Sequence, residues 1–120
     1  RKGKNSIGEN SKINGNVTNS TIGNNCIING NVKDSIMMDN VTIGKNSVVE
    51  DSIIGENVRF SGKIMSKNNA YSIVKNKKIK IDKAGAIIGD NVNVSNAVIE
   101  PGCKIWSNKK ISGEIKNDVQ

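Results

Sequence analysis

The feature that most constrains this chain is a six-residue period in its first half. In residues 22–33 an aliphatic side chain returns from Ile22 to Ile28, and an asparagine returns from Asn25 to Asn31. An amphipathic helix would bring apolar residues back after three or four positions, and a half-buried strand would bring them back after two. The period therefore predicts a structure that repeats a short strand and a turn.

The period extends over more than fifty residues, as full hexads separated by short steps such as "NST" and "DSI". The first hexad position is aliphatic and holds Ile7, Ile13, Ile22, Ile28, Met37, Ile43 and Ile54. The fourth is Asn in every full hexad: Asn10, Asn16, Asn25, Asn31, Asn40, Asn46 and Asn57. The fifth is small or aliphatic and holds Ser11, Val17, Cys26, Val32, Val41, Ser47 and Val58.

A coil of three short strands joined by three corners explains these positions. Stacking such coils at the inter-strand spacing of about 4.8 Å makes a triangular prism, and the first hexad position points into it. Tight corners need small residues and positive φ, which Gly adopts freely and Asn at modest cost. We therefore predict that the Asn series marks corners, and that it is structural rather than a ladder for a ligand or for ice.

The rhythm stops at about residue 65 and resumes at about residue 87. The last third brings back aliphatic residues at Ile88, Val94, Ile99, Ile105 and Ile111. Cys103 falls on the small fifth position, as Cys26 does, so we predict two buried thiols and no disulfide. The boundaries are β-helix coils over residues 1–64, an inserted arm over 65–86, and coils to the end over 87–120, all within one domain.

The inserted arm alternates apolar residues around "KNKK", a pattern typical of a β-hairpin. Tyr71 and Ile73 lie on one side of that turn, and Ile79 and Ile81 on the other. The arm is also the most basic stretch, with Lys75, Lys77, Lys78, Lys80 and Lys83. Such a run suits a solvated charged loop and an anion-binding loop equally well.

Composition limits the class of protein. The 120 residues, at 12.9 kDa, suffice for one domain, and 2% aromatic residues indicate an aliphatic core. The net charge of +7 suits anionic partners, although A/T-rich codons for Lys, Asn and Ile would also supply it. The sequence has no long apolar run, no signal segment and no metal-binding cysteine pattern, so we expect a cytoplasmic protein with no membrane partner, no nucleic-acid partner and no metal.

The hexads resemble those of left-handed parallel β-helix proteins. Within that superfamily, "VKDSIMMDNVTIGKNSVVEDSIIGENV" resembles the C-terminal β-helix of sugar-1-phosphate nucleotidylyltransferases. The arm followed by "AGAIIGDNV" and "NAVIEPGCKI" resembles the C-terminal domain of archaeal bifunctional enzymes that combine sugar-1-phosphate nucleotidylyltransfer with amino-sugar acetyltransfer. The resemblance implies an all-β, left-handed β-helix with a hairpin arm, a homotrimer and a nucleotidyltransferase domain in the full-length chain. The first residue, Arg1, suggests that the sequence is a piece of such a chain.

The resemblance also implies a site, from which this chain departs. Family acetyltransferases use an arm His as general base on the sugar amine, and this sequence has no His. The arm offers Asn68, Asn69 and Tyr71 instead; amides are poor bases, and the pKa of Tyr starts near 10. The same absence of His argues against a three-imidazole zinc site.

Three further positions are candidates for binding. Asn96 matches a family Asn that contacts substrate, and by its third hexad position it falls outside the corner series. Lys78 and Lys80 suit the phosphates of coenzyme A or a nucleotide sugar. No covalently bound cofactor is expected, and acetyl-CoA would be a co-substrate.

Three interpretations of function stay open at this stage. In the first, the domain assembles a nucleotidylyltransferase of nucleotide-sugar biosynthesis and binds acetyl-CoA and an amino-sugar phosphate. In the second, it is a trimerisation or regulatory scaffold that binds no ligand. In the third, it is a stand-alone hexapeptide acyltransferase with an unusual base, for which Tyr71 is the weak candidate. The missing His favours the scaffold.

Overall fold

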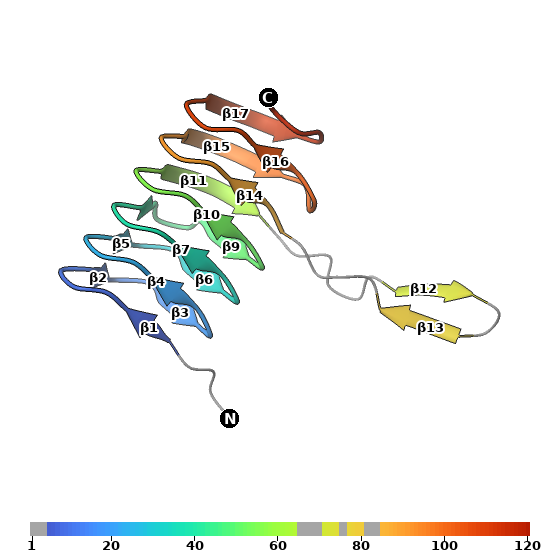
Figure 1. Ribbon diagram of the computed structural model, residues 1–120, viewed down its shortest axis with the longest axis horizontal. Coiled ribbons are helices and arrows are strands. Elements are labelled where there is room, and N and C mark those ends of the chain that lie inside the picture. The colour runs from blue at the N-terminus through green and yellow to red at the C-terminus, as the bar shows by residue number, and fades with distance from the viewer. Residues whose placement is uncertain (1–4, 65–70, 75–76, 81–84) are drawn as a thin grey trace.

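The computed structural model of this chain describes residues 5–64, 71–74, 77–80 and 85–120. Within these ranges every regular element is a β-strand. Short parallel strands stack coil upon coil along one direction, as Figure 1 shows. This arrangement confirms the parallel β-helix predicted from the hexads.

Each coil contributes to three faces. Face 1 is a six-stranded parallel sheet. Its strands are β1 (Ser6–Ile7), β4 (Thr21–Ile22), β7 (Ile36–Met37), β10 (Ile53–Ile54), β14 (Ile87–Ile88) and β16 (Lys104–Ile105).

Faces 2 and 3 belong to one continuous sheet. Face 2 holds β2 (Lys12–Ile13), β5 (Ile27–Ile28) and β8 (Thr42–Ile43), and face 3 holds β3 (Asn16–Thr18), β6 (Asn31–Lys33) and β9 (Val48–Glu50). In the later coils β11 (Arg59–Ile64), β15 (Asn93–Ile99) and β17 (Lys110–Ile115) bend from face 2 onto face 3. Arg59 of β11 accordingly pairs with β8, whereas Lys63 pairs with β9.

The coil length follows from the hexads and the short steps. Stacked residues lie 15 positions apart in the first coils, which is two hexads plus a three-residue step. They lie 17 positions apart where a corner is longer. The "NST" and "DSI" steps therefore set the length of a coil.

The interior is an aliphatic column. First-position residues from Ile22 to Ile105 and fifth-position residues from Cys26 to Val58 are buried, and the aromatic ring of Phe60 is buried with them. Fully burying such side chains contributes about 1.5–3 kcal/mol each. Ile13 and Ile111, toward the two ends of the stack, are only partly buried.

The corner between faces 1 and 2, here called corner 1, has a left-handed Asn in every coil. These residues, with φ between 57° and 64°, are Asn10, Asn25, Asn40, Asn57, Asn91 and Asn108. The backbone N–H of Asn25 donates to the carbonyl of Glu9 at 2.8 Å, and Asn91 makes the same bond to Glu56 at 2.8 Å. The prediction that Asn marks corners is thus confirmed here.

Asn16 and Asn31 are not left-handed corner residues, so the prediction is wrong for them. Both begin strands, β3 and β6, and the Asn16 Nδ2 donates to the Asn31 Oδ1 at 3.0 Å. In "INGN" the Gly comes third rather than second, and it is the constrained residue. A Cβ on Gly15 would collide with the carbonyl oxygen of Gly30 in the next coil. In these first two coils the corner between faces 2 and 3, corner 2, therefore turns tightly without a left-handed Asn, whereas in the third coil it contains the left-handed Asn46.

The corner between faces 3 and 1, corner 3, contains a ladder of buried serines. Ser20, Ser35 and Ser52 each donate a hydroxyl hydrogen bond to the carbonyl two residues earlier, at 2.8–2.9 Å. Each hydroxyl also accepts the backbone N–H of the next coil, as Ser20 accepts from Ser35 at 3.0 Å. The ladder ends at Ala86, whose N–H donates to Ser52 Oγ at 3.0 Å.

The inserted arm contains the predicted hairpin and leaves the stack unbroken. β12 (Tyr71–Val74) and β13 (Lys77–Lys80) form an antiparallel sheet of their own. β14 then pairs with β10 in parallel, with Ile87 next to Ile53. A Cβ on Gly85 would meet the Glu50 carbonyl oxygen, so the chain returns to corner 3 through a residue without a side chain.

We predict that the left-handed Asn residues at the corners can be replaced by Gly but not by a β-branched residue. Asn25 has φ 58° and Asn46 has φ 64°, and a β-branched residue is strained in that conformation. Asn25→Val or Asn46→Val should lower the free energy of unfolding by about 1–3 kcal/mol, whereas Asn→Gly at either position should be mild. Urea denaturation measures both, and equal stabilities of the Val and Gly variants would contradict the corner assignment.

Candidate functional site

Asn96 lies where β15 bends from face 2 to face 3. Its φ is 48°, and its backbone N–H donates to Ser61 Oγ at 3.0 Å. The expectation that it falls outside the corner series is wrong. Asn96 lies at the register shift of β15, between Ser95 and Ala97, and its own backbone is left-handed. Its side-chain amide is exposed and has no hydrogen-bond partner in the described part of the chain. A binding role for Asn96 stays a prediction.

The other candidate residues belong to the arm. In the hairpin, Tyr71 pairs with Lys80, and Ile73 pairs with Lys78. Asn68 and Asn69 lie outside the described residues. The arm leaves after β11 on face 3 and the chain returns at β14 on face 1, so it is inserted at corner 3, whereas Asn96 lies at corner 2. Within a single chain, Asn96 and the insertion point of the arm therefore lie at different corners.

The motif "GAIIGD" has a structural explanation at every position except the exposed Ile87. Gly85 and Ala86 fit over the "DS" step of the coil before, and Ile88 fills the core. A Cβ on Gly89 would approach Ser107 Oγ to 2.6 Å. Asp90 Oδ1 accepts the backbone N–H of Glu56 at 2.8 Å.

"EPGC" also has a structural explanation, as a turn. Cys103 N–H donates to the Glu100 carbonyl at 3.4 Å, and Gly102 has φ 92°. Pro at the second position and left-handed Gly at the third are the preferences of a type II turn. The turn brings the chain round corner 3 after β15.

A hollow of about 250 Å³ lies where the chain returns from the arm. Its walls are mostly apolar and include Ile53, Ile87 and Cys103, with Asp51 and Lys104 adding charge. Burial, followed by the negative charges of Asp118 and Glu100, raises the pKa of the Cys103 thiol. A raised pKa reduces the thiolate fraction at neutral pH, so Cys103 is poorly suited to act as a nucleophile.

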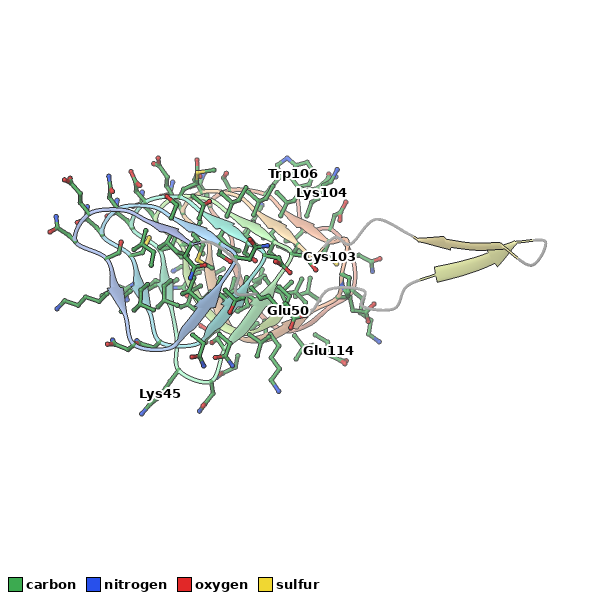
Figure 2. The ribbon with its side chains drawn as sticks, turned by 90° about the horizontal axis from the view of Figure 1, so that it is seen from below. Lys45, Glu50, Cys103, Lys104, Trp106 and Glu114 are labelled. Atoms are coloured by element: carbon green, nitrogen blue, oxygen red, sulfur yellow. The ribbon has the colours of Figure 1, made fainter. Side chains whose placement is uncertain are left out.

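The outer surface of face 1 carries a column of exposed aliphatic residues. Ile36, Ile53 and Ile87 stack in register on β7, β10 and β14, and they are 41–46% exposed. Trp106, 47% exposed, follows β16. Figure 2 shows Trp106 and Lys104 together on the outside of the prism, and both line a second hollow of about 250 Å³ with Ile87.

The sequence analysis missed this column, although a signal was present. In "SIM", "SII" and "AII" two apolar residues are adjacent. Neighbouring side chains of a strand point to opposite faces, so one of each pair has to point outward. The hexad pattern draws attention only to the inward residue.

The described residues offer little for metal chemistry. Among them no group of three or more His, Cys, Asp or Glu residues is arranged to hold a metal ion. In the same residues no helix is long and apolar enough to cross a membrane.

The stacked coils, the aliphatic column and the three corners define a hexapeptide-repeat β-helix protein. Residues 2–120 match the GMPPB C-terminal domain family, and the chain belongs to that family. It is 37% identical over 94 residues to Bifunctional protein GlmU of Methanococcus maripaludis strain C7, and 36% identical over 94 residues to the protein of that name from strain C5. Each match covers 70% of this chain and 23% of the relative. The resemblance to archaeal bifunctional enzymes is therefore confirmed.

We predict that both thiols are reduced and unreactive in the folded protein. Cys26 and Cys103 are free and buried. A thiol reagent should label them slowly at pH 8 and rapidly after unfolding, and the raised pKa should further slow labelling of Cys103. Ser112→Cys, at an exposed position, is the fast-labelling control. Rapid native labelling of both residues, or the mass of a disulfide between them, would contradict the hexad register.

Proposed function

We propose that this chain is the β-helix part of a sugar-1-phosphate nucleotidylyltransferase of nucleotide-sugar biosynthesis, and that it assembles the enzyme as a homotrimer. The observation that carries the proposal is the aligned Ile36, Ile53 and Ile87 on face 1. Membership of the GMPPB C-terminal domain family supports it. In this proposal a separate nucleotidyltransferase domain of the full-length protein performs the chemistry, in the cytoplasm.

Face 1 suits a second copy of the same prism. Its strands are parallel and in register over all the coils, so Ile36, Ile53 and Ile87 lie directly above one another on its outer surface. Three identical prisms packed around an axis parallel to their own bring equivalent residues together. The apolar column of one copy would then be covered by the apolar columns of its neighbours, and each covered Ile removes apolar surface from water.

The chemistry of the chain argues against acetyl transfer. The sequence has no His to deprotonate an amino group, and the thiol of Cys103 is buried with a raised pKa. General acid–base catalysis typically contributes 10²–10⁴-fold. Positioning of substrates alone would leave a weak catalyst, so assembly explains the fold better than turnover does.

A specific observation favours a second candidate function, the binding of acetyl-CoA without turnover. The hollow beside the arm has apolar walls and Lys104 at its edge, a combination that suits a thioester chain and a nearby phosphate.

The first prediction of this proposal concerns oligomeric state. The unaltered chain should have the mass of a trimer by analytical ultracentrifugation, and Ile53→Lys with Ile87→Lys should shift it to a monomer, because charges cannot be buried against equivalent charges. Ile27→Lys is the matched control, since Ile27 is an exposed Ile of face 2, 39% accessible.

Two outcomes would contradict the assembly role. One is an unaltered chain that remains monomeric at every concentration. The other is a loss of oligomer in the Ile27→Lys control as large as in the face 1 variant, which would place the interface elsewhere.

The second prediction concerns acetyl transfer. The chain should show little or no transfer from acetyl-CoA to glucosamine-1-phosphate at neutral pH in a thiol-release assay, because it lacks the imidazole base. Calorimetry with acetyl-CoA measures binding separately. Binding that weakens in Lys78→Ala or Asn96→Ala without turnover would support a ligand site that has lost its chemistry.

The remaining outcomes separate the alternatives. An absence of acetyl-CoA binding would leave assembly alone. Robust turnover that Tyr71→Phe abolishes would overturn the proposal, because another proton acceptor would then have replaced the His.

A further inference from the structure

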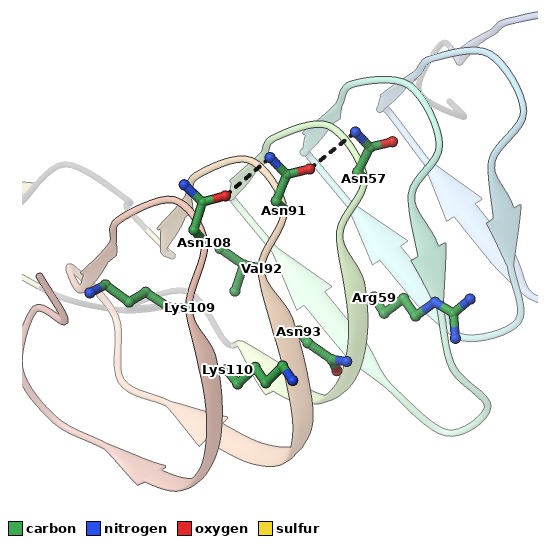
Figure 3. Close-up of a pocket in the computed structure, with 8 residues that line it drawn as sticks. All are labelled: Asn57, Arg59, Asn91, Val92, Asn93, Asn108, Lys109 and Lys110. Carbon is green, nitrogen blue, oxygen red and sulfur yellow. Dashed lines mark hydrogen bonds between the residues drawn. The ribbon is translucent and has the colours of Figure 1, made fainter.

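A cationic groove runs along corner 1 and the adjoining edge of face 2, whereas the arm is inserted at corner 3. Its volume is about 380 Å³. It is lined by Asn57, Arg59, Asn91, Val92, Asn93, Asn108, Lys109 and Lys110. Three cations and four amides line it, and none of the described residues that line it is acidic (Figure 3).

The floor of the groove is a column of three outward side chains. Arg59 pairs with Asn93, and Asn93 pairs with Lys110. The three residues are the first residues of β11, β15 and β17, and they stack on face 2. Parallel strands stack at about 4.8 Å, so the two cations flank an amide at short range. All three side chains are exposed, and Figure 3 shows Lys110 lying beside Asn93.

The wall of the groove is a fixed row of amides at corner 1. Asn57 Nδ2 donates to Asn91 Oδ1 at 3.1 Å, and Asn91 Nδ2 donates to Asn108 Oδ1 at 3.2 Å. The row orients every amide in the same sense. Its last nitrogen, Nδ2 of Asn108, donates to no described residue and is available to an acceptor.

Lys109 is the residue that the repeat does not explain. The residue after the left-handed Asn of corner 1 is small or aliphatic in the preceding coils, where it is Ser11, Cys26, Val41, Val58 and Val92. In the last coil a long cation takes that position and is only partly buried. Packing would favour another small residue, so the charge at this level calls for a different reason.

The positive charges of the groove are not neutralised within the described ranges. Arg59, Lys109 and Lys110 make no side-chain hydrogen bond or ion pair with any described residue. The nearby carboxylate of Asp90 is engaged by the backbone N–H of Glu56 at 2.8 Å. A bound anion would supply the negative charge that the described side chains do not supply to these cations.

We propose that this groove binds the diphosphate group of a small anionic ligand. The guanidinium of Arg59 at one end of the column and the ammonium of Lys110 at the other suit an anion with two linked phosphate groups, and the amide of Asn93 between them supplies a neutral hydrogen bond. Inorganic pyrophosphate and a nucleoside diphosphate share this chemistry. Nucleotidyl transfer from a nucleoside triphosphate to a sugar phosphate releases pyrophosphate and forms a nucleoside diphosphate esterified to the sugar. This link to the reaction rests on the proposed function, whereas binding in the groove does not depend on trimer assembly.

Calorimetry on the chain in low-salt buffer tests the proposal. Inorganic pyrophosphate should bind, inorganic phosphate should bind more weakly, and added salt should weaken both. Arg59→Gln with Lys110→Gln should reduce pyrophosphate affinity by about tenfold or more, because charge-assisted hydrogen bonds are lost. Lys12→Gln is the matched control, since Lys12 begins β2 in the same outward column of face 2.

The comparison of ligands identifies the source of the diphosphate. Tighter binding of UDP than of pyrophosphate would indicate a nucleotide, and equal or weaker binding would indicate pyrophosphate itself; either result supports the site. Circular dichroism checks that each variant is folded. The proposal is overturned if pyrophosphate does not bind the unaltered chain, or if Lys12→Gln weakens it as much as Arg59→Gln with Lys110→Gln does. A monomeric chain that still binds pyrophosphate would reject trimer assembly without rejecting the groove.

Discussion

The stacking of each coil on the previous one depends on a backbone that turns through the left-handed conformation at fixed positions. At corner 1 the left-handed Asn directs its N–H at the carbonyl of the coil below, as Asn25 does to Glu9 at 2.8 Å. Because that bond recurs in each coil, the strands of face 1 stay in register and the aliphatic residues stay in one column. A residue strained at positive φ would disturb the corner, the ladder and the core together.

The corner residues and the inward aliphatic residues of each coil are constrained by backbone geometry and packing. The outward side chains are not, so they can differ from coil to coil. Face 1 uses this freedom for Ile36, Ile53 and Ile87, and face 2 uses it for Arg59, Asn93 and Lys110. Both sets are columns because parallel strands place equivalent residues above one another. Function in such a solenoid therefore depends on what a few successive coils present at the same outward position.

The arm illustrates how a solenoid accepts an insertion. The chain leaves after Ile64 and returns at Gly85, and Ile87 still pairs with Ile53 as though the coil had been continuous. The corner tolerates this because the backbone N–H of Ala86 donates to Ser52 Oγ at 3.0 Å. Asn96 belongs to the stacked coils, and the left-handed bend of β15 fixes its backbone.

The sequence by itself determined the repeated strand and turn, the inward residues, most of the Asn corners, the buried thiols and the hairpin. It could do so because each of these follows from local spacing, and the resemblance of the hexads supplied the family. Only the tertiary structure decided that Asn16 and Asn31 belong to strands and that Asn96 is left-handed. It alone also showed that Arg59 and Lys110, 51 positions apart in sequence (110 minus 59), share one groove. The physical reason is strand register. Which residues stack on one another depends on the length of every corner and on the insertion between coils, and a local sequence pattern does not contain that information.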